Sequence, residues 1–164
     1  MTTKSYSVTM VVDQSPTEVF NAINNVRGWW SGEITGVTDR LGAEFTYAYK
    51  AYHRSTHKIT EFVPGRRVVW LTTAASINFV NDKSEWNGTE IVFDITRRAD
   101  KTQLRFTHIG LVPTIECYGG CSGAWQSLIT EGLFKLISRG KSRRVALDGP
   151  VSRSTPTRRR QMTA

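Results

Sequence analysis

Apolar and polar residues alternate over much of the first 111 residues, and this pattern predicts β-strands. In residues 5–12, Tyr6, Val8 and Met10 fall on one face and Ser7 and Thr9 on the other, which is typical of a strand with one buried face. Turn-forming residues or polar loops then separate five further strand-like runs, at 43–50, 53–62, 66–73, 88–97 and 102–111. Short connections between successive strands predict an antiparallel meander.

Two segments carry helical rather than strand periodicity. Ser15, followed by Pro16 and Glu18, forms a capping-box pattern that predicts a short helix between the first two strands. Residues 115–139 are predicted to form one long helix that ends at Gly140. The apolar stripe of this helix consists of Trp125, Leu128, Ile129, Leu133, Leu136 and Ile137.

This order of elements predicts an α+β domain over residues 1–140, in which a curved antiparallel sheet of about six strands wraps around the long C-terminal helix. The remaining residues, 141–164, are rich in Ser, Thr, Pro and Arg and are predicted to be a disordered basic tail. The chain contains no apolar run of the roughly 18 residues that a membrane-spanning helix needs. It has only two cysteines and no export signal in its N-terminal residues, so we expect a cytoplasmic protein without membrane insertion.

The net charge of +8 changes this picture little, because most of it lies in the tail. Residues 141–164 contain seven basic residues and one acid, a net charge of +6, which leaves +2 for residues 1–140. No aromatic residues are interleaved with the arginines of the tail, so nucleic acid is a disfavoured partner. A protein partner for the tail or for the outer surface remains an alternative.

Several segments together resemble a known superfamily. The run GWWS, the strands GAEFTYAY and KITEFVPGRRVVW, and the segments WNGTEIVFDI and LRFTHIGLVPTIECY occur in order within residues 4–140. They resemble the START-like (SRPBCC) superfamily, in the bacterial branch related to the activator of heat-shock-chaperone ATPase. The resemblance implies a helix-grip fold with a cavity between sheet and long helix. Members include lipid carriers, hormone receptors and aromatic polyketide cyclases, so it does not fix the activity.

The candidate ligand-binding residues are those predicted to face the long helix or to lie on its apolar stripe. An apolar pocket with a few polar groups would suit a lipidic or flat ligand, although the same pattern is also typical of plain core packing. The set comprises Phe45, Tyr47, Tyr49, Trp70, Ile91, Phe93, Phe106, His108, Trp125, Ile129 and Leu133. The adjacent Trp29 and Trp30 would gate the pocket, contact a partner or anchor the short helix to the sheet.

Candidate chemistry is sparse. His108 follows two apolar residues on one strand face, where it would serve as a ligand contact, as a general base, or as a satisfied structural group. Cys117 and Cys121 lie four residues apart and are interpreted as buried or semi-buried thiols rather than as part of a metal site. His53 and His57 are predicted to lie on one solvent-exposed face of their strand. We therefore expect no metal and no cofactor.

Binding of a small hydrophobic or aromatic molecule in an internal cavity, without chemistry, is the favoured function. Two alternatives remain open. One is a cavity enzyme of cyclase or hydrolase type that uses His108 and a tyrosine. The other is co-chaperone-like stimulation of a chaperone ATPase through the outer surface.

Overall fold

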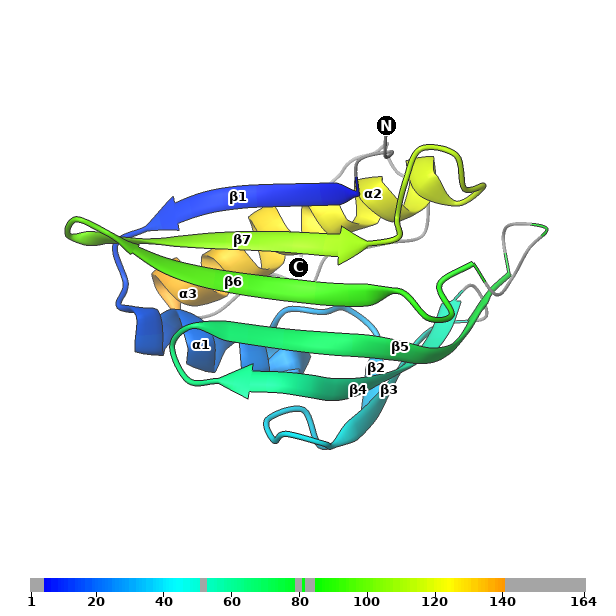
Figure 1. Cartoon of the computed structure of the whole chain (residues 1–164), viewed down its shortest axis with the longest axis horizontal. Helices are drawn as coiled ribbons and strands as arrows, with labels where there is room; N and C mark the ends of the chain where they lie inside the picture. The colour runs from blue at the N-terminus through cyan, green and yellow to red at the C-terminus, as the bar shows by residue number, and fades with distance from the viewer. Residues whose placement is uncertain (1–4, 51–52, 79–80, 82–84, 141–164) are drawn as a thin grey trace, which may run out of the picture.

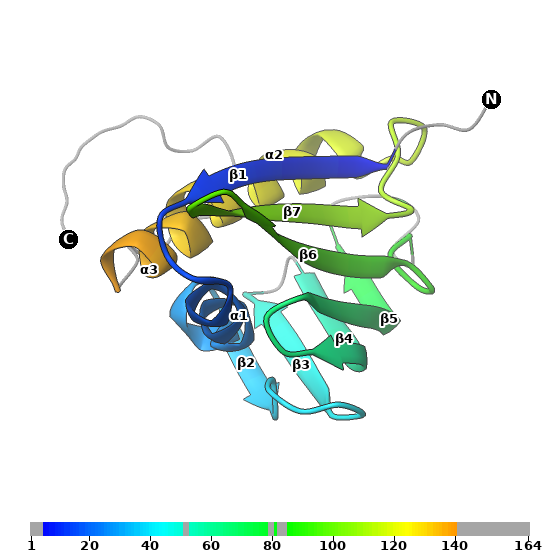
Figure 2. The ribbon, with the colours of Figure 1, turned by 60° about the vertical axis from the view of Figure 1, so that its left-hand side comes forward.

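A computed structural model of the chain describes residues 5–50, 53–78, 81 and 85–140, in which seven strands form one antiparallel sheet. The strands are β1 (Tyr6–Val12), β2 (Glu33–Gly36), β3 (Glu44–Tyr49), β4 (His53–Val63), β5 (Arg67–Ile77), β6 (Glu90–Arg98) and β7 (Lys101–Ile109). Their order is β1-β7-β6-β5-β4-β3-β2, and every neighbouring pair is antiparallel. The curved sheet has its helices on one side (Figures 1 and 2). This is the predicted α+β helix-grip fold.

The sheet has one strand more than the sequence pattern indicates. The additional strand, β2, has only four residues and pairs with β3 at the edge of the sheet. Four residues are too few for an alternation of apolar and polar positions to stand out. Strand β5 also continues to Ile77, beyond its predicted end at residue 73.

The short helix α1 (Pro16–Asn24) forms where the capping pattern predicts it. The Ser15 hydroxyl accepts a hydrogen bond from the Glu18 amide, and the Glu18 carboxylate accepts one from the Ser15 amide. These reciprocal bonds satisfy two of the amides that a helix N-terminus leaves free. The buried side chains of Val19 and Ile23 hold α1 against the sheet. A 3-10 turn, η1 (Val26–Gly28), then leads into Trp29 and Trp30.

The C-terminal helix begins later than predicted and is not uniform. It comprises α2 (Tyr118–Ser127), a π-helical segment η2 (Leu128–Leu133) and α3 (Phe134–Arg139). It starts at Tyr118 rather than at residue 115. Just before it, the Glu85 carboxylate accepts hydrogen bonds from the amides of Glu116 and Cys117. Gly140 ends the helix in a left-handed conformation (φ 79°), as predicted.

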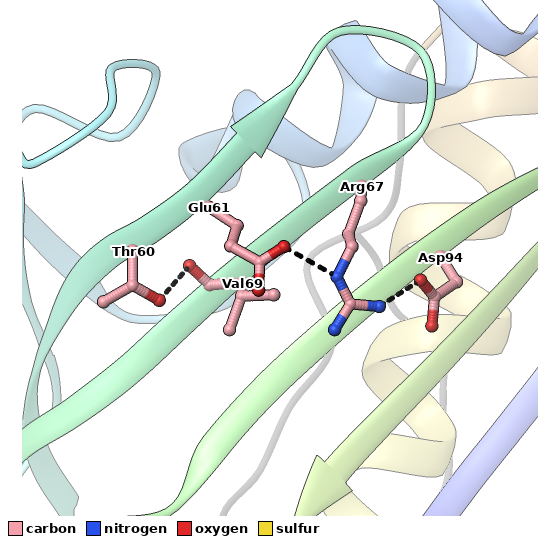
Figure 3. Close-up of polar contacts among 5 residues, drawn as sticks. All are labelled: Thr60, Glu61, Arg67, Val69 and Asp94. Atoms are coloured by element: carbon pink, nitrogen blue, oxygen red, sulfur yellow. Dashed lines mark hydrogen bonds and ion pairs between the residues drawn. The ribbon is translucent and has the colours of Figure 1, made fainter.

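The two faces of the sheet differ sharply. The inner face is apolar and aromatic, and it packs against the helices. On the outer face, Arg67 is paired with Glu61 on one side and with Asp94 on the other, which links β4, β5 and β6 (Figure 3). Each of these three exposed charges therefore has an ion-pair partner within the sheet. The described residues contain no helix long and apolar enough to cross a membrane, and the predicted tail, 141–164, lies outside them.

Candidate functional site

The space between the sheet and the C-terminal helix is occupied by a group of aromatic and histidine side chains, which we call the aromatic–histidine cluster. The sheet contributes five of its members, the C-terminal helix one and the loops two. All of them are buried except His53, which is half-buried. The members are Trp30, Tyr47, His53, His57, Trp70, Trp86, His108 and Trp125.

Two indoles from loops fill the centre of the cluster. Trp30 stacks on Tyr47 with ring centroids 3.9 Å apart, and it lies 5.1 Å from Trp125 on the C-terminal helix. Trp86, from the β5–β6 connection, stacks on Trp125 at 5.9 Å. The His57 ring lies 5.6 Å from Trp30 and 6.5 Å from Trp86. Both loop indoles therefore bridge the sheet and the helix.

The prediction that His53 and His57 are exposed to solvent is wrong. His57 is 0% exposed and His53 is half-buried. Both side chains point inward, on the same face of β4 as the buried Ser55 and Ile59. His53, Ser55 and His57 are polar, so they were not recognised from the sequence as an inward face. Their strict alternation with the exposed Arg54 and Lys58 is the signal that could have identified it. All three histidines of the protein thus lie in one cluster.

A line of hydrogen-bonding side chains runs through this cluster, and we call it the polar line. His53 Nε2 lies 3.0 Å from Ser55 Oγ, and Ser55 Oγ lies 2.8 Å from His57 Nε2. His57 Nδ1 is in turn 3.1 Å from Thr72 Oγ1. A hydroxyl both donates and accepts, so the bonds of the polar line can run in either direction. Among the described residues, nothing hydrogen-bonds to His53 Nδ1 at its outer end.

His108 is held differently, at what we call the His108 node. The Trp125 indole N–H donates to His108 Nδ1 at 3.0 Å. Because an indole can only donate, Nδ1 carries no proton, and the neutral ring carries its proton on Nε2. That nitrogen donates to Thr89 Oγ1 at 2.8 Å, and the Thr89 hydroxyl donates to the Trp86 carbonyl at 2.7 Å. Both ring nitrogens are engaged, which favours a structural role for His108 over that of a general base.

Burial keeps all three imidazoles neutral. It lowers the pKa of His53 to about 4. Burial, with a smaller contribution from His53, lowers the pKa of His108 to about 3. The pKa of His57 is held well below its ordinary value, first by burial and then by its two histidine neighbours. At neutral pH the cluster therefore offers hydrogen-bonding groups without a positive charge.

Three buried polar groups in or next to the cluster lack partners. The indole N–H groups of Trp70 and Trp86 and the Ser31 hydroxyl make no hydrogen bond within the described part of the chain, although Trp70 is 0% exposed. An unpaired buried donor costs on the order of 1–3 kcal/mol. Such a group calls for an explanation, and a bound water or ligand is the usual one.

The predicted ligand-binding residues converge on the same interior. All of them are buried except Tyr49, which is half-buried beside Lys50. Ile129 and Leu133 lie on the π-helical segment and face inward with the aromatic rings of the sheet. Sequence reasoning left Trp86 out, because its loop has no periodicity, and it left open whether Trp30 was a gate, a contact or an anchor.

The two cysteines are free, buried thiols, as interpreted from the sequence. The neighbouring Cys117 thiol and burial together raise the pKa of Cys121 far above its ordinary value. Its thiol therefore stays protonated and unreactive. The described residues contain no group of three or more His, Cys, Asp or Glu side chains that could hold a metal ion.

Comparisons with known proteins identify relatives of this architecture. A model of the family described as "Activator of Hsp90 ATPase homolog 1-like protein" matches residues 13–137. The Aha1 dimer from Colwellia psychrerythraea is 21% identical, with 85% of this chain and 99% of that chain covered and a TM-score of 0.68. SSP2350 from Staphylococcus saprophyticus is 16% identical (87% and 98% covered, TM-score 0.64). CalU16 from Micromonospora echinospora is also 16% identical (94% and 76% covered, TM-score 0.62).

At these identities the structural likeness shows the fold alone. No functionally curated protein matches the sequence.

Proposed function

The chain belongs to the family of activator of Hsp90 ATPase homolog 1-like proteins, and from that premise we propose that it binds a small hydrophobic or aromatic molecule between its sheet and its C-terminal helix, without chemistry. The observation that carries this proposal is the polar line set inside an aromatic interior. Ligand sites are mostly apolar and contain a few placed polar groups, and His53, Ser55, His57 and Thr72 are such groups.

Stability alone gives little reason for this composition. Each buried imidazole or hydroxyl must find a partner or cost free energy, whereas aliphatic side chains fill a core without that demand. The Trp70 N–H lacks a partner even so. A molecule that stacks on the rings and accepts a hydrogen bond would satisfy this group.

The enzyme alternative has less support, because His108 has no free lone pair with which to take a proton. Ser55 lies between two imidazoles but is 1% exposed, so a substrate would have to enter the core to reach it. For the co-chaperone alternative the family description is the only support. On the outer face, Glu61 and Asp94 both pair with Arg67, so each of these three charges already has a partner within the protein.

Native mass spectrometry of the purified full-length protein, followed by a thermal-shift titration, tests the proposal. The probes are 2-naphthol and naphthalene as flat ligands and oleate as a lipid. We expect a co-purifying small molecule, or a melting temperature that rises with probe concentration. A probe at about 100 times its Kd would add roughly 2.7 kcal/mol of stability.

Two variants make the titration specific to the interior. Tyr47→Leu removes a ring that stacks on Trp30 and should weaken the response. Asp94→Asn, on the outer face, should leave it unchanged. The proposal fails if no molecule co-purifies and no probe shifts the melting temperature, or if both variants respond like the unchanged protein.

A further inference from the structure

We propose that the indole of Trp30 occupies the position in which the ligand binds, here called the seat. A neutral, flat aromatic molecule of about two fused rings would bind there by displacing this indole. Displacement requires movement of residues 28–32, here called the Trp-Trp segment. This inference rests on the proposed binding function and names the class of ligand and its position.

The surroundings of Trp30 are those of a bound flat molecule. Tyr47 stacks on it at 3.9 Å, with 17° between the ring planes. Trp70 lies parallel to it within 4° at 6.0 Å, and Trp125 lies 5.1 Å away on the helix side. The His57 ring also lies next to Trp30, with ring centroids 5.6 Å apart. A flat ring system in this position would meet aromatic faces from both layers of the fold.

Trp30 is also one of the two cluster members that lie outside the strands and helices, and its amide donates to the Val26 carbonyl at 2.9 Å. Tyr47 and Trp70 belong to strands, and Trp125 belongs to the C-terminal helix. The other loop indole, Trp86, is fixed through its carbonyl, which accepts two hydrogen bonds from Thr89. The Trp30 side chain makes no hydrogen bond to any described residue, so ring packing alone holds it in place.

Glycines lie where the Trp-Trp segment packs against the sheet and against the C-terminal helix. Gly32, two residues later, has a φ of 127°, and a Cβ there would lie 2.6 Å from the Tyr47 ring. Only glycine adopts such a conformation without strain. On the helix side, the Trp29 carbonyl lies so close to Gly132 that a Cβ would approach it to 2.8 Å. Gly132 belongs to the π-helical segment η2, a deformation that is frequent at functional sites.

The chemistry of the seat selects against charged ligands. The rings around Trp30 contribute no cationic side chain, and burial keeps His57 neutral. A carboxylate would lose its hydration there without gaining a counter-charge. A neutral aromatic molecule with a hydroxyl or carbonyl oxygen suits the seat better, because that oxygen can accept from the unpaired Trp70 N–H.

Trp30→Ala tests the seat directly, with Trp29→Ala as the matched control. Both variants delete a buried indole from the same segment, but Trp29 is tied to α1 through its N–H, which donates to the Ile23 carbonyl at 3.1 Å. Calorimetric titration with 2-naphthol should give Trp30→Ala a Kd at least about tenfold lower than that of the unchanged protein, because the internal competitor has been removed. Trp29→Ala should show no such gain. A folded Trp30→Ala without tighter binding, or an equal gain in both variants, would overturn the inference.

Hydrogen exchange of the unchanged protein keeps the inference testable if Trp30→Ala does not fold. With bound 2-naphthol, the amides of residues 28–32 should exchange at least about threefold faster than in the free protein. If 2-naphthol binds but the amides of residues 28–32 exchange at the same rate or more slowly, the displacement of Trp30 is contradicted. The proposed binding function would then still stand. If the unchanged protein binds none of the probes, the proposed function fails, and the Trp30→Ala titration still decides whether the seat accepts a flat molecule.

Discussion

The polar line and the His108 node both place a neutral imidazole inside an aromatic core, but they differ in the freedom that remains. At the node, the Trp125 N–H fixes which nitrogen of His108 bears the proton, and Thr89 takes up the other nitrogen. In the polar line, the Ser55 hydroxyl lies between the two imidazoles and the Thr72 hydroxyl lies beyond His57, so the direction of every hydrogen bond can reverse. The His108 node therefore has a single arrangement of its protons, whereas the polar line can adapt to a ligand that donates or accepts a hydrogen bond. A ligand therefore finds a responsive surface only at the line.

Lowering the pH should produce the largest change in the free energy of unfolding, because it favours protonation of the histidines in both the polar line and the His108 node. At pH 7.5 and above, well over the ordinary histidine pKa of about 6.5, the histidines are largely neutral in the folded and unfolded chain alike. As the pH falls below 6.5, the unfolded chain takes up protons that the folded chain excludes, so the free energy of unfolding falls. With a folded pKa of about 4, His53 alone accounts for a loss of about 3 kcal/mol. Urea unfolding between pH 7.5 and 4.5 measures the slope.

A matched variant sharpens this test. His53→Gln should make the free energy of unfolding depend less steeply on pH between 6.5 and 4, because the unfolded chain then has one fewer histidine to protonate. A stability that is constant from pH 7.5 to 4.5 would show that the three imidazoles are not buried as neutral groups.

Truncation of His108 should cost more than truncation of His53. His108→Ala leaves the Trp125 N–H without its acceptor and opens a cavity in a fully buried place, with an expected loss of about 3–5 kcal/mol in the free energy of unfolding. His53→Ala acts at the half-buried end of the line, and we expect roughly 1–2 kcal/mol. Urea unfolding at pH 7.5 compares the two variants, and equal losses would remove the distinction between node and line.

Two threonine-to-valine changes probe the same difference with little change of shape. Thr89→Val leaves His108 Nε2 with a buried proton and no acceptor, because Trp125 fixes the other nitrogen. We expect a loss of about 2–3 kcal/mol. After Thr72→Val, His57 can turn a bare nitrogen toward the valine, and an unsatisfied acceptor costs less than an unsatisfied donor. A loss of about 1 kcal/mol is expected, and the reverse order in chemical denaturation would contradict the tautomer assigned to His108.

The smallest effect should come from the outer face. Asp94→Asn removes one partner of Arg67, but both side chains are well exposed, at 40% and 38%. We expect a change in stability of less than about 1 kcal/mol, which diminishes further in 0.5 M salt. Unfolding at low and high salt checks this, and a large, salt-independent loss would mean that the outer row of charges has a role in stability.

The sequence predicts the arrangement of elements better than it predicts the contents of the site. Alternation identified six of the seven strands, and the capping box at Ser15 identified the first helix, because both signals are local. The chemistry of β4 was missed, because His53 and His57 look polar and become partners only when Ser55 and Thr72 are brought beside them. The seat of Trp30 depends on a contact between distant residues, Trp29 and Gly132, and no local pattern encodes that contact.

The most direct test of the proposed binding site is nitrogen-15 NMR of the three imidazole rings in the unchanged protein at pH 7.5, recorded while 2-naphthol is added. We predict that the ring signals of His53 and His57 shift in step with binding, while His108 keeps a bare Nδ1 and a protonated Nε2 throughout. Bound 2-naphthol with no change at His53 and His57, or with a change confined to His108, would contradict the assignment of the polar line as the part of the cluster that contacts the ligand.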